Sequence, residues 1–184
     1  LFRSATAYKF SGQSEKALAD YKAVQDRDKD NHIVARQIAF IHYESGAKDG
    51  LEKAEAQFAK ALESNPDDMY AAIFLHIVKG KLKKQGSPIA GFAARHKDSE
   101  EWPMPAVNLF AGTASPERCL EQAAAGKPVE NGWRICGAYY YIGQKSLLDG
   151  DSAKAAEAFR KCLGTKDLKA LEYLYAKKEL ESLK

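Results

Sequence analysis

The clearest pattern of hydrophobic and polar positions lies over residues 139–163, YYYIGQKSLLDGDSAKAAEAFRKCL. An aromatic-rich segment is followed by the polar turn Asp149-Gly150-Asp151 and by a second segment that carries small residues and the bulky Phe159. Gly143 and Ala155 are small enough for two helix backbones to approach, while larger neighbours fill the volume around them. The pattern therefore predicts a helical hairpin.

The same pair of helices is expected at the start of the chain. Ala5 and Ala17 are 12 residues apart, the same interval as between Gly143 and Ala155. A polar segment follows this first pair and ends at Asn31, which is a favourable N-cap for the next helix. The chain is thus built from repeated helical hairpins.

The marked positions resemble the tetratricopeptide repeat, a hairpin of about 34 residues with the order aromatic-x2-aliphatic-Gly and then Ala-x3-Phe. In the clearest copy these positions are Tyr139, Ile142, Gly143, Ala155 and Phe159. The resemblance implies an all-α fold: a right-handed α-solenoid of about five hairpins, the middle ones degenerate, with a C-terminal capping helix.

We expect one solenoid domain over residues 1–184. Its expected parts are two repeat units over 1–65, degenerate units over 66–126, a further unit over 131–165 and a capping helix over 167–184.

The degenerate region keeps the length of two repeats but little of their signature. Ala54 and Ala155 are 101 residues apart, close to three periods of about 34 residues. A long helix is expected from Asp67 to Gly86. Shorter helices are expected in SPIAGFAARH, EWPMPAVNLFAG and SPERCLEQAAAG, two of which begin with a serine cap followed by proline.

The last segment has apolar residues at helical spacing and a polar outer face, which is typical of a helix that covers the open end of a solenoid. The positions expected to face inward are Leu168, Leu171, Leu174 or Tyr175, and Leu180.

Composition excludes several classes of function. The 184 residues carry 28 Lys and Arg against 25 Asp and Glu, a net charge of +3 that gives no reason to expect a nucleic acid partner. The four histidines are scattered, and no nucleophile elbow, phosphate loop or dinucleotide motif is present in the sequence. We therefore expect no enzymatic activity, no cofactor and no metal.

The densest positive charge is the run from Lys79 to Lys84, KGKLKK. Cations are favoured near a helix C-terminus, so a solvated helix end is the preferred interpretation. An RNA or phosphate site is the alternative, although no interleaved aromatic residues form a stacking surface.

Three cysteines, Cys119, Cys136 and Cys162, have no metal-binding spacing. Buried free thiols are the preferred interpretation. The alternative is a bridge between Cys136 and Cys162, which lie at the same end of the last hairpin.

No apolar run approaches the roughly 20 residues of a membrane span. The chain opens with Leu1, part-way through a repeat, so we expect a fragment or a processed chain whose targeting signal lies upstream.

Tetratricopeptide solenoids bind extended peptides or helices in a groove lined by the first helix of each unit, so the resemblance implies a protein or peptide partner. Register places a set of aromatic, basic and amide side chains there: Arg3, Thr6, Lys9, Phe10, Arg36, Gln37, Phe40, Tyr43, Tyr140, Tyr141 and Gln144. An equal alternative is that Tyr140 and Tyr141 pack against the capping helix and Phe40 against its neighbour. The Lys and Asn pattern of the carboxylate clamp for chaperone tails is missing.

From Glu101 onward the chain resembles the NlpI-type tetratricopeptide lipoproteins of bacterial envelopes. The matching residues are Trp102, Val107, Gly112, Glu172, Tyr175, Ala176, Glu179 and Leu180, together with the last hairpin. The resemblance implies a non-enzymatic adaptor, tethered in the envelope, that docks a protease or cell-wall hydrolase and forms a homodimer. A cytoplasmic assembly or regulatory module is the alternative.

Overall fold

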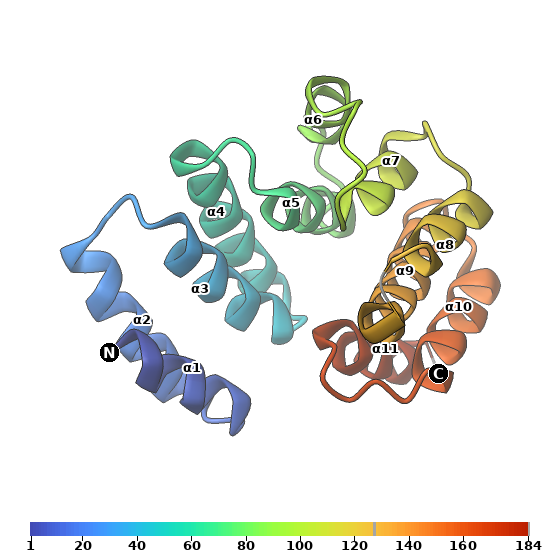
Figure 1. Ribbon diagram of the computed structural model, residues 1–184. Helices are drawn as coiled ribbons and strands as arrows, with labels where there is room; N and C mark the ends of the chain where they lie inside the picture. The colour runs from blue at the N-terminus through green and yellow to red at the C-terminus, as the bar shows by residue number, and fades with distance from the viewer. Residues whose placement is uncertain (127, 184) are drawn as a thin grey trace. The chain divides into compact units, whose positions relative to one another are not determined.

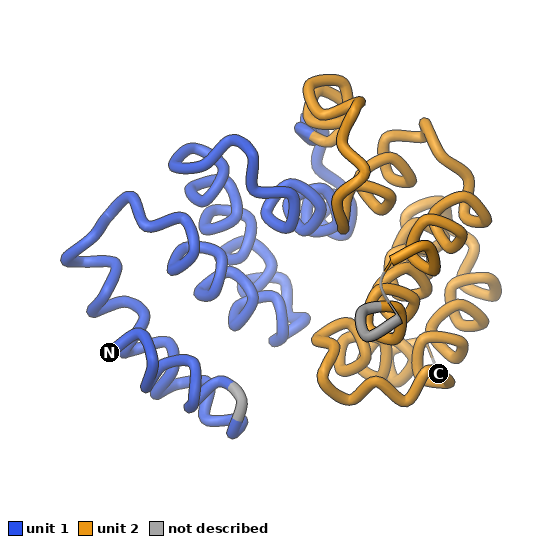
Figure 2. Tube along the Cα trace, viewed as in Figure 1, with its two compact units in different colours: residues 1–88 blue, residues 89–184 orange. Residues whose placement is uncertain are grey.

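The computed structural model describes residues 1–126 and 128–183, with the backbone alone at residue 10 and at 128–130. All regular structure in this part of the chain is helical, in eleven α-helices without a strand. This confirms the expected all-α fold of helical hairpins. The chain divides into two compact units, Leu1–Pro88 and Ile89–Lys184, where a single domain was expected, and each is described by itself (Figure 2).

Unit 1 holds five helices, and each packs on the next along the chain (Figure 1). They are α1 (Phe2–Phe10), α2 (Ser14–Arg27), α3 (His32–Glu44), α4 (Lys48–Ser64) and α5 (Met69–Lys81). The Asn31 side chain accepts a hydrogen bond from the Val34 backbone N–H at 3.1 Å, which confirms the predicted N-cap of α3.

The core of unit 1 forms where the repeat pattern places small and large residues. Ala5, Ala17 and Tyr21 have no exposed surface and pack against α3. Further along, the ring centroid of Phe74 lies 4.9 Å from that of Phe40 and 5.7 Å from that of Phe58. Aromatic packing thus joins α3, α4 and α5.

Unit 2 holds the remaining helices. They are α6 (Ile89–Arg95), α7 (Met104–Ala111), α8 (Pro116–Ala124), α9 (Pro128–Leu148), α10 (Ser152–Gly164) and α11 (Leu171–Ser182). Helices α6 to α10 pack in chain order, and α11 contacts both α9 and α10.

The hairpin of α9 and α10 has the predicted geometry. A Cβ atom on Gly143 would lie 2.4 Å from the ring of the fully buried Phe159, so only glycine allows this approach. Gly150 has a φ of +85°, and the Asp151 carboxylate caps α10 by accepting a hydrogen bond from the Lys154 backbone N–H at 3.0 Å. The turn and the close contact are both confirmed.

A tryptophan supports the other side of α9. A Cβ atom on Gly137 would lie 2.8 Å from the Trp102 ring, and the Trp102 and Trp133 centroids are 6.0 Å apart in an edge-to-face arrangement. The helix after Trp102 ends at Gly112, whose φ is +76°. Trp102 and Gly112 thus have structural roles in unit 2.

Two helix ends differ from the sequence prediction. The N-cap of α5 is Asp68 and not Asp67, because the Asp68 carboxylate accepts a hydrogen bond from the Ala71 N–H at 3.0 Å.

Helix α5 ends at Lys81, before Gly86. It ends there because Lys83 takes a left-handed φ of 56° and the Lys84 N–H donates a hydrogen bond to the Lys79 carbonyl at 2.8 Å. Helix α6 begins at Ile89, directly after Pro88, and Ser115 caps α8 as predicted.

The capping helix buries Tyr175, one of the two alternatives predicted at its centre, and Leu171 and Leu180 are half-buried as predicted, whereas Leu168 and Leu174 are not covered. Tyr175 and Ala176 are buried, whereas 69% of Leu168 and 50% of Leu174 are exposed. Leu168 precedes α11, and Leu174 lies on its outer face. None of the described helices combines the length and hydrophobicity needed to cross a bilayer.

Candidate functional site

Side chains from the first helices of successive hairpins meet across unit 1. The Lys9 ammonium on α1 donates a hydrogen bond to Gln37 Oε1 on α3 at 2.9 Å. It also lies 4.9 Å from the centroid of the Phe40 ring, within range of a cation–π interaction. Lys9 therefore bridges two hairpins while it keeps part of its surface exposed.

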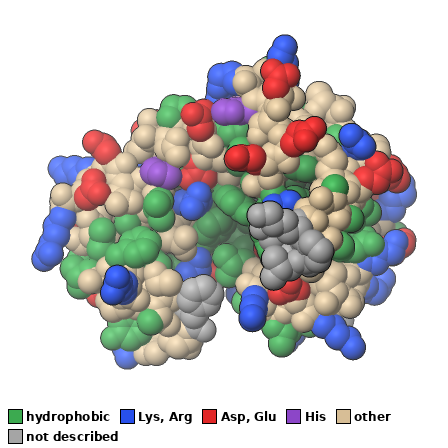
Figure 3. All heavy atoms as spheres, in the orientation of Figure 1, with side chains coloured by type: hydrophobic (Ala, Val, Ile, Leu, Met, Phe, Trp, Pro, Cys, Tyr) green, Lys and Arg blue, Asp and Glu red, His purple; other side chains and the backbone are tan. Residues whose placement is uncertain are grey.

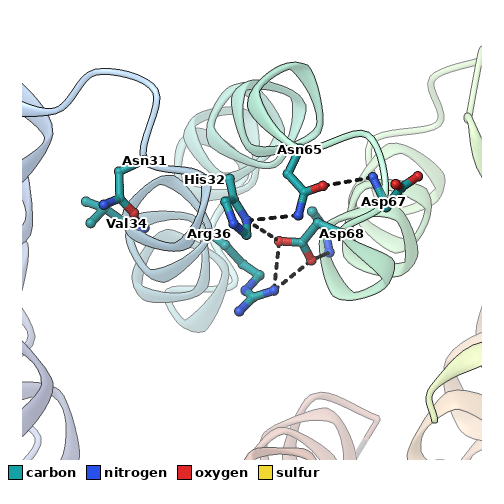
Figure 4. A network of polar contacts seen from close by, with 8 residues as sticks. Asn31, His32, Val34, Arg36, Asn65, Asp67 and Asp68 are labelled. Atoms are coloured by element: carbon teal, nitrogen blue, oxygen red, sulfur yellow. Dashed lines mark hydrogen bonds and ion pairs between the residues drawn. The ribbon is translucent and has the colours of Figure 1, made fainter. Parts of the chain in front are cut away.

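A buried carboxylate links the next pair of hairpins. Figure 4 shows His32 and Arg36 of α3 turned toward Asp68, the N-cap of α5. Arg36 Nη1 donates to both Asp68 oxygens at 2.7 Å, and His32 Nδ1 lies 3.2 Å from Oδ2. Asn65 joins the network through its Nδ2, which lies 3.5 Å from His32 Nδ1, and its Oδ1 accepts from the Asp67 N–H at 3.2 Å. The Asp68 side chain has no exposed surface, so its charge is compensated by Arg36 and the helix N-terminus.

Arg36 and Gln37 belong to a continuous row of partly exposed side chains. The Arg36 guanidinium lies 5.6 Å from the centroid of the Tyr70 ring on α5. Ile33, one turn before Arg36 and Gln37, is 40% exposed. We call this row the unit 1 strip, which comprises Thr6, Lys9, Ile33, Arg36, Gln37 and Tyr70.

The Lys9 amine is electrostatically unusual. Burial, opposed by the Glu44 charge and assisted by that of Arg36, lowers the pKa of Lys9 from 10.5 to about 8. An amine with this pKa exchanges a proton close to physiological pH. It can act as a cation or as a neutral hydrogen-bonding group.

A comparison with known protein families gives a match to the first hairpin of unit 1, which is formed by α1 and α2. Residues 1–31 match the family model described as tetratricopeptide repeat. The first hairpin of the chain is therefore similar to a tetratricopeptide repeat. A search of curated proteins gives no match. Tetratricopeptide repeats generally mediate protein–protein interaction and are typically non-enzymatic.

The tetratricopeptide register distinguishes exposed from covered positions in unit 1. Arg3 is exposed, and Thr6 is half-buried with its hydroxyl 2.9 Å from the Tyr21 hydroxyl. Phe40 and Tyr43 are each 5% exposed and lie in the aromatic core. They therefore pack beneath the exposed side chains of the strip and are not part of its surface. The side chain of Phe10 lies outside the described part of the chain.

The three groove positions predicted on α9 are covered. Tyr140, Tyr141 and Gln144 have no exposed surface. The Tyr141 hydroxyl donates to Glu172 Oε1 at 2.7 Å, and the Gln144 amide donates to Glu179 Oε1 at 2.8 Å. Because both acceptors belong to α11, the capping helix occupies this face, and these three residues are not available as anchors while it is seated.

The contact with α11 also perturbs a carboxylate. Burial raises the pKa of Glu172 above its usual 4.5, and the hydrogen bond from Tyr141 opposes the increase. The Tyr140 and Tyr175 rings pack beside it with centroids 5.9 Å apart. The capping contact therefore combines an aromatic pair, Tyr140 and Tyr175, with two hydrogen bonds, from Tyr141 to Glu172 and from Gln144 to Glu179.

The lysine run at the end of α5 has local partners. The Lys79 ammonium donates to the Gly86 carbonyl at 3.0 Å, and Lys84 pairs with Glu55 at 2.6 Å. On the face drawn in Figure 3, Lys and Arg side chains alternate with Asp and Glu. These contacts favour the helix-end interpretation of the run.

Register alone missed part of the strip. Tyr70 and Asp68 lie in a degenerate unit where the tetratricopeptide signature gave no positions. Ile33 could have been found from its place one turn before Arg36 on the same helix face. Across the residues that the structure describes, no three His, Cys, Asp or Glu side chains are grouped in a way that could hold a metal ion.

Proposed function

We propose that this protein is a scaffold that binds a protein or peptide partner along the unit 1 strip. The observation that carries the proposal is the strip itself, a row of partly exposed side chains from α1, α3 and α5 supported by a rigid aromatic core. Rows of this kind combine apolar contact with directed hydrogen bonds, which suits recognition of an extended segment.

The side chains of the strip suggest what the partner segment contains. Ile33 offers apolar surface, whereas Lys9 and Gln37 offer hydrogen-bonding groups. Arg36 is already paired with Asp68, so its charge is largely neutralised. A segment with an apolar residue near Ile33 and an acceptor or carboxylate near Lys9 fits this arrangement best.

A location in the bacterial envelope belongs to the same proposal and rests on the NlpI-type resemblance of the C-terminal half. In that setting the scaffold acts as an adaptor, with a homodimer as a further expectation. A cytoplasmic assembly module is the alternative. Fractionation of cells that express the native gene product distinguishes the two locations.

Site-specific photocrosslinking tests the binding face. A benzophenone amino acid is placed at Ile33 or Gln37 in the strip, or at the exposed Lys22 on α2 as a matched control. Each protein is checked for helical content by circular dichroism and then irradiated in lysate of the source organism.

We expect a protein adduct from Ile33 and Gln37 that competes with unlabelled protein, and none from Lys22. An adduct from Lys22 alone would place the partner on another surface. If Ile33 and Gln37 yield only RNA crosslinks, the strip contacts a nucleic acid and the proposal of a protein partner is wrong.

A further inference from the structure

Two of the three cysteines lie against each other inside unit 2. Cys136 on α9 and Cys162 on α10 are 26 residues apart in the sequence, yet their Sγ atoms are 3.2 Å apart. Both side chains are fully buried. A disulfide has an S–S bond of about 2.0 Å, so bond formation needs a movement of only about 1 Å.

The pair lies at the junction of three helices. Cys136 is in the first half of α9 and Cys162 is near the end of α10, so these two antiparallel helices meet there. The Cys162 thiol is also 3.7 Å from the Glu172 carbonyl in α11. A covalent link at this point therefore joins α9 to α10 beside the seat of the capping helix.

The two thiols are chemically unequal. The hydrogen bond from Cys162 lowers the pKa of Cys136, and the same contact together with burial raises the pKa of Cys162. Thr165, whose hydroxyl donates to the Cys162 carbonyl at 2.7 Å, further favours the Cys136 thiolate. Cys136 is thus the better nucleophile of the two.

We propose that Cys136 and Cys162 form a reversible intramolecular disulfide. The oxidant is a disulfide compound, either a small molecule or a thiol oxidoreductase. The Cys136 thiolate attacks one of its sulfurs and expels a thiolate, and Cys162 then attacks Cys136 in the mixed disulfide and expels the second. The two cysteines lose two protons and two electrons, and the oxidant becomes two thiols.

The bridge has a mechanical consequence for the last hairpin. It fixes the first half of α9 to the end of α10 and so opposes separation of the hairpin, which α11 covers. A bridge across about 26 residues also restricts the unfolded chain, which raises the unfolding temperature. Such bonds persist in oxidising compartments and are opened in reducing ones.

The third cysteine provides a matched control. Cys119 lies on α8, is fully buried and has a pKa raised by burial to about 12. Its thiol is therefore a poor nucleophile compared with Cys136. If every cysteine were oxidised to the same extent whatever its surroundings, Cys119 would react as readily as the other two.

The test counts thiols. Folded protein is incubated with oxidised glutathione, denatured without reductant and labelled with a mass-tagged maleimide. Three labels are expected after reduction and one after oxidation, and peptide mapping should find Cys136 joined to Cys162. Cys119→Ala should then give none, whereas Cys136→Ala and Cys162→Ala should each give two.

Thermal unfolding provides a second measurement. Oxidation should raise the Tm of the wild type and of Cys119→Ala by about 5–10 °C and leave Cys136→Ala and Cys162→Ala unchanged. Three labels after oxidation would overturn the proposal. Bridges to Cys119, or a Tm that does not respond to oxidation, would also contradict it.

Discussion

The first helices of unit 1 and helix α9 of unit 2 carry equivalent positions of the same repeat register, but they differ in what covers them. Lys9, Arg36 and Gln37 keep part of their surface exposed, whereas Tyr140 and Tyr141 keep none. The cause lies outside the repeat, because α11 covers the face of α9. Register therefore sets the direction of a side chain, and the elements around the repeat decide whether a partner can reach it.

The two faces also differ in how they are held together. In unit 1 the aromatic contacts of α3, α4 and α5 are accompanied by polar contacts to the buried Asp68. In unit 2 the packing within the last hairpin is aromatic, with the Tyr140 centroid 5.4 Å from that of Tyr141 and 6.0 Å from that of Phe159. One face is suited to recognition, while the other contributes to the core.

The largest effect that separates the two faces is expected from Tyr175→Ala. Tyr175 is 3% exposed and packs on Tyr140, so its removal leaves a cavity under the capping helix. Loss of a buried aromatic side chain costs about 3–5 kcal/mol of unfolding free energy. Urea denaturation measures the loss.

Leu174→Ala is the matched control for this change. Leu174 is the adjacent residue and is 50% exposed, so its truncation should cost less than about 1 kcal/mol. Equal losses for the two variants would mean that α11 is seated differently and that Tyr140 and Tyr141 are less covered than described.

These residues also show what the sequence could and could not predict. The small residues at Ala5, Ala17 and Gly143 revealed the hairpins, because close approach of helices leaves a pattern at fixed intervals. The pattern could not decide between Leu174 and Tyr175 on the capping helix, since both fit helical spacing. It left open whether Tyr140 and Tyr141 face a groove or pack against the capping helix, because the contact that decides this joins residues 31 positions apart.

The strip was predicted only where the repeat signature is regular. Lys9, Arg36 and Gln37 lie in recognisable units, whereas Tyr70 and Asp68 follow a boundary where the signature fades. Their roles depend on contacts with α3, and such contacts are set by tertiary structure. Sequence reasoning therefore found two of the three helices that carry the strip.

The next effect in size is expected from Asp68→Ala in unit 1. The change removes the N-cap of α5 and the partner of Arg36, at a cost of about 2–4 kcal/mol. Urea denaturation gives the loss. Asp67→Ala, at the exposed neighbour, should cost less than about 1 kcal/mol. A small loss at Asp68 would show that the strip does not depend on this network.

A smaller effect that depends on pH is expected from Tyr141→Phe. At pH 7 the change leaves the buried Glu172 carboxylate without the phenol donor and should cost about 1–2 kcal/mol. The folded pKa of Glu172 is raised above 4.5, so the folded chain holds its proton to higher pH than the unfolded chain does. The contribution of Glu172 to stability therefore falls as pH rises through the window above 4.5.

Denaturation at pH 4 and pH 7 checks this. Tyr141→Phe should cost less at pH 4, where Glu172 is protonated. In a Glu172→Gln background the cost should no longer depend on pH. A dependence that persists in that background would point to a different carboxylate at the capping contact.

The smallest effect is expected from Lys9→Met, and it is the sharpest test of the contrast between the two faces. Methionine keeps most of the length of the side chain and replaces the cation–π contact with Phe40 by a sulfur–aromatic one, so unfolding free energy at pH 7 should change by less than about 1 kcal/mol. Between the folded pKa of about 8 and the usual 10.5, the unfolded wild-type chain binds more protons than the folded one. Wild-type stability should therefore rise with pH relative to Lys9→Met across that window.

Denaturation at pH 7 and pH 9 measures the change in unfolding free energy and its dependence on pH. Lys22→Met on α2 is the reference for losing an exposed lysine. A loss of more than about 2 kcal/mol at pH 7 would mean that Lys9 contributes to the stability of the core, as Tyr140 does. The strip would then be needed for folding and would not be a surface that is free to bind a partner.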